Sequence, residues 1–435
     1  MIGVEHLKQR FLAAGGNSET FKYQCRKGML EVEADPKIAA DLAARGDVAR
    51  VAANRPWSPP ALLPALRAPE SAESVESVES IEPNVELVGA PALWAQGITG
   101  QGIVIGIADT GFEWEHPALQ AHYRGWNGSA AVHDYNWHDA VHDAAAGNAC
   151  GSDTTAPCDD HGHGTGVAGF AVGQTTGVSI GVAPGASLIG CRNMAGGTGT
   201  TARYTECFEW FLAPTDSNGQ NPRPDLGPDV INNSWVCPAS EGCSDPDVFE
   251  GIIGAVRAAG IAVTFAAGNR GAQCSTLAEA AGVGPSAFTI GATNLDDTIA
   301  TFSAFGPVTS DGSGRLKPDL TAPGVNLRTS GRGDTYFRFS GTSAASPHVA
   351  GAIALIWSSV PRLRGDVDGT EDLLERSAVP LTSDVDCGSF SGSDVPNPVF
   401  GWGRLDIVQA FALSLGREVP VLAPNAGATR TLPPR

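Results

Sequence analysis

Short apolar runs, each followed closely by Gly, Asn or Asp, recur through the middle of the chain. Between the third and fourth of these runs, Val248–Ala259 has apolar residues at helical spacing. Short strands that alternate with helices predict a doubly wound α/β fold, in which a mostly parallel sheet is buried on both faces. In such sheets the active site collects at the carboxyl ends of the strands. The runs occupy residues 103–108, 187–189, 230–231, 261–266 and 288–290.

The front of the chain has a different pattern. We expect residues 1–60 to form a small α+β domain, because apolar residues alternate between helical and strand spacing and proline stands at one helix start. The helices are expected at Val4–Ala14 and Pro36–Arg45, and the strands at Met29–Glu33 and Asp47–Ala52.

Residues 61–85 are predicted to be a linker. A Pro-rich sequence is followed there by an acidic triplet repeat, Ser74–Glu82. The apolar residues of this repeat do not recur at the helix or strand spacing that would bury one face. An exposed segment of this kind is a natural place for proteolytic cutting. The main domain is then expected at residues 86–415, followed by a flexible tail rich in Pro, Ala and Gly at 416–435.

The charge of the chain is strongly negative and unevenly distributed. The formal net charge is −19, yet residues 1–69 hold 10 Lys and Arg against 7 Asp and Glu. The negative net charge of the chain would repel the phosphates of a nucleic acid, so nucleic acid is excluded as a main partner. A basic front piece before an acidic body is compatible with simple solubility or with packing of the front piece onto the body. No apolar run is long enough for a membrane span, and Met1–Arg10 is too polar for a secretory signal.

Nine cysteines indicate a compartment that permits disulfides. None has the C-x-x-C spacing of a zinc ribbon. The sequence does not fix the pairing. If cysteines that are neighbours in the sequence pair with each other, Cys25 of the front piece has no partner. The four expected disulfides then join Cys150 to Cys158, Cys191 to Cys207, Cys237 to Cys243, and Cys274 to Cys387.

Four polar residues lie at the ends of predicted elements. Asp109 closes the strand at 103–108, Asn269 follows the strand at 261–266, and His163 and Ser343 each stand where a helix starts. Each alone has an ordinary structural explanation, as a turn residue or a helix cap. Together they supply an orienting carboxylate, an oxyanion donor, a base and a nucleophile, which is the set that acyl transfer needs.

The sequences that follow His163 and Ser343 predict how the two helices there begin. Small residues after His163 predict a helix packed tightly against its neighbours. The helix after Ser343 is expected to begin close to it, because Pro347 is tolerated only in a first helical turn. A metal site is the alternative for His161 and His163, but two histidines two residues apart do not share a helix face. We therefore assign no metal ligand.

The order Asp109, His163, Ser343 separates this set from other serine hydrolases, since an α/β-hydrolase has its serine first and a chymotrypsin-like enzyme has its histidine first. The motifs around these residues resemble those of the subtilase family of serine proteases, over about residues 86–413. Three further segments resemble the bacillopeptidase F-like branch of this family. The family motifs are Asp109-Thr110-Gly111, His163-Gly164-Thr165, Ala266–Asn269 and Gly341–Pro347. The segments that resemble the branch are Tyr135–Trp137, Cys158–His163 and Val230–Trp235.

This resemblance implies a serine endopeptidase that cleaves proteins and peptides through an acyl-enzyme intermediate. By similarity Ser343 is the nucleophile, His163 its base, and Asp109 the carboxylate that orients the base. The oxyanion hole is formed by the Ser343 N–H and the side chain of Asn269. The same similarity assigns substrate binding to Ser234, Trp235, Val236, Ala267 and Gly268.

Two positions depart from the family pattern. Gly166 stands where a second histidine is frequent, which concerns packing rather than chemistry. Val236 stands where this branch usually has glycine, so its side chain narrows the substrate cleft and specificity is not inherited. The front piece, above all Pro36–Pro56, resembles subtilase propeptides. This implies a self-processing zymogen whose mature N-terminus lies between residues 57 and 85.

The chemistry requires no cofactor, and structural Ca²⁺ is compatible with the family, with no ligand assigned. We expect an extracellular or secreted monomer, although no signal peptide is visible in this chain. Two other classes stay open. A catalytically silent binding protein of this fold would lack a triad member, and an acid-active sedolisin-type peptidase would use carboxylates in place of His163. The intact Asp-Thr-Gly and His-Gly-Thr motifs count against both.

Overall fold

The computed structural model describes residues 80–143, 148–243 and 245–417, together with short N-terminal pieces at 21–22, 31–32, 40 and 43–44. Most of the domain expected at 1–60 and most of the 61–85 linker therefore lie outside the described residues, as does all but the start of the tail. The last residues of the expected linker, 80–85, hold a short strand at Ser80–Ile81 and the start of the helix at Pro83–Leu87. Within the front piece, β1 (Phe21–Lys22) pairs antiparallel with β2 (Glu31–Val32), which falls inside the strand expected at Met29–Glu33.

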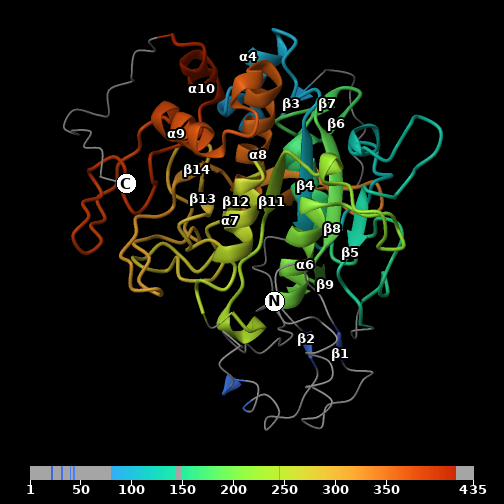
Figure 1. Ribbon diagram of the computed structural model, residues 1–435. Coiled ribbons are helices and arrows are strands. Elements are labelled where there is room, and N and C mark those ends of the chain that lie inside the picture. The colour runs from blue at the N-terminus through green and yellow to red at the C-terminus, as the bar shows by residue number, and fades with distance from the viewer. Residues whose placement is uncertain are drawn as a thin grey trace.

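A seven-stranded parallel sheet forms the centre of the molecule, with strand order β14-β13-β12-β11-β4-β8-β5 (Figure 1). Five strands fall on the five predicted apolar runs, which confirms the expected fold class. The edge strands β5 and β14 were not predicted. The bounds are β4 Val104–Asp109, β5 Trp137–Asp139, β8 Ser187–Arg192, β11 Val230–Asn233, β12 Ala262–Ala266, β13 Phe288–Thr293 and β14 Leu320–Pro323.

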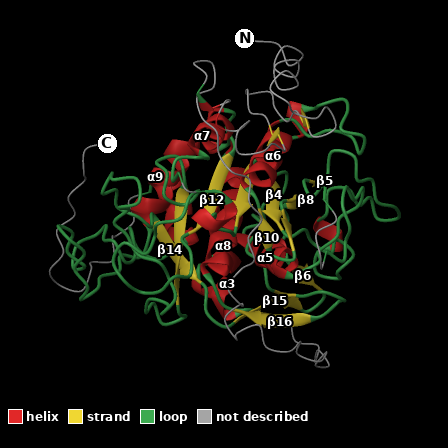
Figure 2. Cartoon of the chain, turned by 90° about the horizontal axis from the view of Figure 1, so that it is seen from below, coloured by secondary structure: helices red, strands yellow, loops and turns green. Residues whose placement is uncertain are grey.

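Helices cover both faces of this sheet (Figure 2). Ile105 and Ile107 of β4 pack in the core that includes α5 and α8, whereas Ala108 packs in the core that includes α6 and α7. Side chains alternate between the two faces of a strand, so one short apolar run supplies both cores. The helices are α3 Pro83–Leu87, α4 Ala90–Trp94, α5 His163–Val172, α6 Thr201–Leu212, α7 Glu250–Ala258, α8 Thr342–Ser359, α9 Val367–Ser377 and α10 Ile407–Ser414.

Besides the β1–β2 pair, short strands outside the central sheet form three further small sheets in the described residues. One of them, the hairpin at residues 327–339, packs against α5. Single 3₁₀ turns lie at Gln120–His122, Pro224–Leu226, Ala239–Glu241 and Pro361–Leu363. These small sheets join β3 (Ser80–Ile81) with β7 (Val178–Ser179) and β6 (Gln174–Thr175), β9 (Met194–Ala195) with β10 (Thr198–Gly199), and β15 (Leu327–Ser330) with β16 (Tyr336–Phe339).

Glycines let α5 approach its neighbours as closely as the sequence predicts. A Cβ atom on Gly164 would lie 2.0 Å from a backbone carbonyl oxygen, and one on Gly169 would lie 2.3 Å from Oγ1 of Thr329. On Gly166 it would lie 3.1 Å from Phe337 and 3.2 Å from Thr329. A second histidine at position 166 would therefore require the side chains of Phe337 and Thr329 to shift.

The position of Pro347 differs from the expectation. It is the sixth residue of α8, in the second turn rather than the first. Its missing N–H leaves the carbonyl of Ser343 without an intrahelical donor. The Oγ of Ser234 donates to that carbonyl at 2.9 Å, so a side chain that follows β11 offsets the loss of the helical hydrogen bond.

All four near-neighbour disulfides predicted from the spacing of the cysteines are present. Three of them close short loops, and the bond between Cys274 and Cys387 spans 113 residues. Cys25 lies outside the described residues.

Candidate active site

The buried carboxylate at the end of β4 and the histidine at the start of α5 lie in direct contact. Asp109 is fully buried, and its Oδ1 accepts hydrogen bonds from Nδ1 of His163 and from the N–H of Thr110, each at 2.7 Å. Because a carboxylate can only accept, Nδ1 of His163 carries the hydrogen and Nε2 of the neutral ring is left as an acceptor. The pair thus has the tautomer and orientation that a general base needs.

The charge of Asp109 also changes the basicity of the imidazole. Burial by itself lowers the pKa of His163, but the charge and hydrogen bond of Asp109 and the charge of Asp159 outweigh this effect. The pKa of His163 is therefore raised above its ordinary value. A raised pKa favours the imidazolium that forms when the ring takes a proton.

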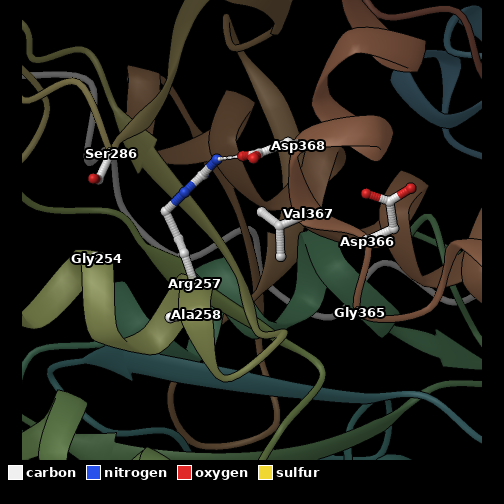
Figure 3. A pocket seen from close by; sticks show the side chains of 8 residues that line it. All are labelled: Gly254, Arg257, Ala258, Ser286, Gly365, Asp366, Val367 and Asp368. Carbon is white, nitrogen blue, oxygen red and sulfur yellow. Dashed lines mark hydrogen bonds and ion pairs between the residues drawn. The ribbon is translucent and has the colours of Figure 1, made fainter.

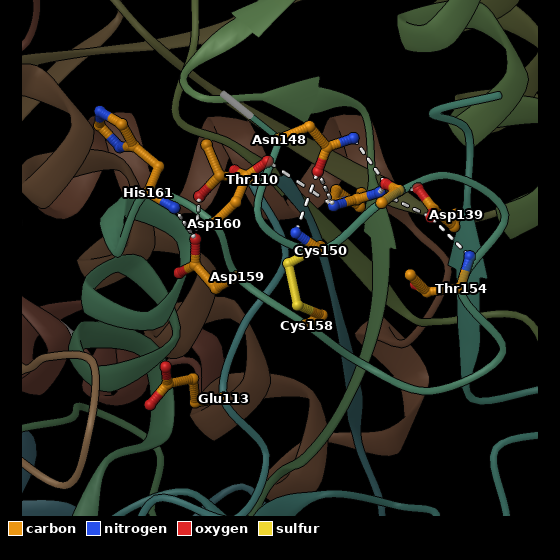
Figure 4. Close-up of a disulfide and its surroundings, with 12 residues drawn as sticks. Thr110, Glu113, Asp139, Asn148, Cys150, Thr154, Cys158, Asp159, Asp160 and His161 are labelled. Carbon is orange, nitrogen blue, oxygen red and sulfur yellow. Dashed lines mark hydrogen bonds and ion pairs between the residues drawn. A yellow bond between two sulfur atoms is a disulfide. The ribbon is translucent and has the colours of Figure 1, made fainter. Parts of the chain in front are cut away.

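A second buried carboxylate, Asp159, ties the start of α5 to the end of β4 (Figure 4). Its Oδ1 accepts from the N–H groups of His161 and Gly162 at 3.0 and 2.8 Å and from Oγ1 of Thr110 at 2.8 Å. Its Oδ2 accepts from the N–H and hydroxyl of Thr165 at 2.9 and 2.6 Å. These bonds satisfy two of the free N–H groups at the start of the helix, those of Gly162 and Thr165, and help fix where the helix places its first residue.

Ser343 lies near the start of α8 and is bonded to the segment after β11. Its Oγ donates to the carbonyl of Ser234 at 2.9 Å, and the Oγ of Ser234 donates back to the carbonyl of Ser343 at the same distance. The contacts of the described residues join Asp109 to His163, but they include no hydrogen bond between Ser343 and His163. The ring of His163 packs on Phe339, four residues before Ser343, with ring centroids 5.2 Å apart.

The amide of Asn269 is held with its nitrogen on the side of Ser343. Its Oδ1 accepts from the N–H and hydroxyl of Thr342 at 2.9 and 3.0 Å. A Cβ atom on Gly341 would lie 3.6 Å from both Nδ2 of Asn269 and N of Ser343. Two N–H donors therefore border one small space, as stabilisation of an oxyanion requires.

The segments expected to bind substrate come together beside this space. Val236 Cγ1 lies 3.5 Å from the Cβ position of Gly268, so the two expected walls face each other. Ser234, Trp235 and Ala267 are buried, and Nε1 of Trp235 donates to a β4 carbonyl at 3.1 Å. The side chains of these three residues therefore hold the walls in place, and their backbones are what remains to contact a substrate.

Sequence reasoning missed the residues that position this site. Thr342 orients Asn269, and its hydroxyl also accepts from the N–H of Gly268 at 3.1 Å. Asp159 was not singled out from the sequence. An acidic residue four positions before the helix start, with Thr165 in the first turn, is a signal that could have identified it.

Among the described residues, no group of three or more His, Cys, Asp or Glu side chains is arranged to hold a metal ion. No step of the chemistry is derived through a metal ion. In the described part of the chain, no helix is long and apolar enough to cross a membrane.

His142, which follows β5, forms an ionic cluster that gives a pH-dependent contribution to stability. Its Nε2 lies 2.9 Å from Oε1 of Glu206 and its Nδ1 lies 2.5 Å from Oδ1 of Asp153. The hydrogen bond that His142 donates to Glu206 is the largest cause that raises the pKa of His142, to about 9. The folded-state pKa thus lies above the unfolded value of about 6.5, so the contribution is complete below pH 6.5 and is lost as pH rises through 9.

We expect this cluster to contribute about 2 kcal/mol to the free energy of unfolding at pH 6, because each unit of pKa difference is worth about 1.4 kcal/mol before solvent screening. Urea unfolding between pH 6 and 10, in a Ser343→Ala background that cannot digest itself, measures the loss. The variant that also carries His142→Gln should lose much less stability over this range. An equal loss with and without His142 would contradict the prediction.

A hollow of about 350 Å³ lies at the other end of the sheet, between α7 and the start of α9 (Figure 3). Arg257 borders it, but its guanidinium is paired with Asp368 and Glu371. Its charge is therefore neutralised, and the lining holds no pair of nucleophile and base. We assign no function to this hollow.

A parallel α/β sheet with a buried Asp–His pair at the carboxyl end of β4, and a serine at a helix start beside an oriented amide, defines a subtilisin-like fold and site. Residues 100–403 match the subtilase family. The chain belongs to this family of serine proteases, as its motifs indicate.

Three curated relatives, all from Bacillus subtilis, give the same result. The chain is 39% identical to bacillopeptidase F over 77% of its own length and 22% of that protein. It is 33% identical to serine protease AprX, over 62% of this chain and 60% of that one, and 32% identical to subtilisin E, over 64% and 61%. The chain thus spans about a fifth of bacillopeptidase F and about three fifths of the other two. The higher identity to bacillopeptidase F agrees with the expected branch.

Proposed function

We propose that this chain is a serine endopeptidase that hydrolyses peptide bonds in proteins and peptides, with Ser343, His163 and Asp109 as its catalytic triad. The observation that carries the proposal is the 2.7 Å hydrogen bond between Nδ1 of His163 and the fully buried carboxylate of Asp109. This bond leaves Nε2 of the ring as a proton acceptor, and the ring packs on Phe339, four residues before Ser343.

In this mechanism Oγ of Ser343 attacks the peptide carbonyl carbon, while Nε2 of His163 takes the hydroxyl proton and then gives it to the leaving amine. A water molecule next releases the acyl group by the same route in reverse. The Ser343 hydroxyl has to leave the Ser234 carbonyl before it can donate to His163. Catalytic hydrogen bonds of a free enzyme commonly tighten only when substrate is bound, so this rearrangement is compatible with the role.

The charge that develops on the carbonyl oxygen is proposed to lie between the N–H of Ser343 and Nδ2 of Asn269. Each donor of this kind contributes about 3–4 kcal/mol to the stability of the transition state. We propose that two segments hold the substrate residue on the amino side of the scissile bond. Ser234–Val236 lies on one side of this residue and Ala267–Gly268 on the other.

A fluorophosphonate probe tests this assignment directly, because it phosphonylates an activated serine Oγ with loss of fluoride. We expect one adduct, located by fragment spectra at Ser343 in the tryptic peptide 339–362, and no adduct in a folded His163→Ala variant. Absence of label from folded wild type, or label at another serine, would remove the basis for the triad.

We further propose that the chain is made as a zymogen. Residues 1–60 are proposed to act as an inhibitory propeptide, the catalytic domain to occupy residues 86–415, and the cut to fall in the acidic linker between residues 57 and 85. The basic charge of the front piece before the acidic body supports this arrangement. The four disulfides support secretion, because such bonds persist in oxidising compartments. The mature enzyme is proposed to act as a monomer.

A further inference from the structure

Beside the candidate oxyanion donors lies a small space with an acidic wall. At Gly268, one residue before Asn269, a Cβ atom would lie 3.6 Å from Oε2 of Glu279 and 3.5 Å from Cγ1 of Val236. It would also lie 3.9 Å from the Cβ of Ala304. No atom approaches closer, so a carboxylate oxygen and two apolar groups border this space at ordinary van der Waals distance.

The position of Glu279 is fixed by the backbone and by a disulfide loop. The N–H of Cys237 donates to the carbonyl of Ala280 at 3.3 Å, which forms an isolated bridge between the two segments. Cys237 is itself bonded to Cys243. The segment that carries Glu279 therefore runs beside the segment that carries Val236, and both meet the strand end at Gly268.

One oxygen of this carboxylate is held and the other faces the space. Nε and Nη2 of Arg270 lie 2.6 and 2.5 Å from Oε1 of Glu279. The Glu279 side chain is only 12% exposed, whereas the Arg270 side chain is 60% exposed and so remains strongly solvated. Oε2, the oxygen that Arg270 does not hold, is directed toward Gly268.

A second buried acid, Glu241, lies close enough to Glu279 for their charges to interact. Glu241 is almost fully buried, and its Oε2 accepts from the hydroxyl of Tyr204 at 2.9 Å. Burial is the main cause that raises the pKa of Glu241 to about 8, and the charge of Glu279 contributes to the rise. At neutral pH Glu241 is therefore largely uncharged. Burial also raises the pKa of Glu279, and the charge and hydrogen bond of Arg270 oppose this rise.

We propose that Glu279 determines specificity by selecting a basic side chain on the amino side of the scissile bond (P1). This inference rests on the proposed function, since it takes Asn269 and Ser343 as the place where the bond is cut. The P1 residue precedes the scissile carbonyl, so its side chain leaves the backbone beside the oxyanion donors, where Gly268 and Val236 lie. The apolar walls contact the methylenes of Arg or Lys, and Oε2 of Glu279 receives the charged end.

The test compares peptides that differ only at P1, where arginine is replaced by its uncharged isostere citrulline. We expect wild type to cleave the arginine peptide with a kcat/KM about 10- to 100-fold higher, the size of one charge-assisted hydrogen bond. Glu279→Gln should reduce this ratio to within about threefold, mainly by loss of arginine cleavage, while citrulline cleavage stays nearly unchanged.

Glu371→Gln is the matched control. Glu371 is 17% exposed and is paired with an arginine, Arg257, as Glu279 is, but it lies on α9 at the opposite end of the sheet. This variant should keep the wild-type ratio. A wild-type ratio near one, or a ratio unchanged in Glu279→Gln, would overturn the proposal while the proposed peptidase function stands.

A failure of the proposed function gives a different result, since folded wild type would then cleave neither peptide. Fluorescence anisotropy of the same two labelled peptides with Ser343→Ala still measures the charge preference without catalysis. Tighter binding of the arginine peptide, lost in the Ser343→Ala/Glu279→Gln double variant, would support the acidic wall. Equal binding of both peptides would refute it.

Discussion

Replacement of Ser343 by alanine is expected to reduce the kcat for casein hydrolysis by about a million-fold. The variant keeps the Asp109–His163 hydrogen bond and the oxyanion donors, so what it loses is the nucleophile and the acyl-enzyme route. The intact mass should change in parallel. Wild type should lack the residues before a cut between 57 and 85, and the variant should retain them.

A Ser343→Ala/His163→Ala double variant provides the control for this experiment. Residues that act as a unit are strongly non-additive, so the double variant should be about as slow as either single variant. Circular dichroism and unchanged disulfides would show that each variant is folded. If Ser343→Ala retained substantial activity, or if it were cut in the linker like wild type, the proposed triad and self-processing would both fail.

The second large effect is expected at Asn269. Asn269→Ala should lower kcat about 100- to 1,000-fold with little change in KM, because the amide is proposed to act on the transition state rather than on bound substrate. Thr342 holds Oδ1 of this amide at 2.9 and 3.0 Å, so the donor is already oriented in the free enzyme. Initial rates on a chromogenic peptide over a range of concentrations separate kcat from KM.

Asn294→Ala is a suitable comparison, because Asn294 is also an asparagine that follows a strand but bonds only within its own turn, to Thr298. Its kcat should stay within about twofold of wild type, as expected for a surface substitution away from the site. A loss at Asn269 that appeared only in KM, or one no larger than at Asn294, would argue against the oxyanion role.

The central sheet could be predicted because its inner strands are apolar runs with clear ends. β4, β8, β11, β12 and β13 all fall on such runs. The edge strands lack this signal for physical reasons. β5 contains His138 and Asp139 within three residues, and β14 ends at Pro323, where a missing N–H is tolerated at the sheet edge.

The four candidate residues of the site could be named from sequence, because each follows a predicted strand or begins a predicted helix. The structure brings Asp109 to His163 and Asn269 to the start of α8. Their chemical roles rest on the family motifs and stay proposals until the variants are measured.

Contacts between segments far apart in sequence could not be predicted. The exchange of hydrogen bonds between Ser234 and Ser343 joins residues 109 positions apart, and no local pattern encodes it. Glu279 is similar, since its approach to Gly268 depends on the bridge between Cys237 and Ala280. Pro347 shows the same limit, because a distant hydroxyl makes a second-turn proline tolerable.

The disulfide between Cys274 and Cys387 affects how a protease of this kind withstands cleavage by other copies of itself. The bond between Cys274 and Cys387 closes a covalent ring that contains all of α8. Autolysis falls first on exposed loops, such as residues 309–314. One nick inside this ring opens it without releasing a fragment, so two cuts are needed before the helix that bears Ser343 can detach from the segment that follows Asn269.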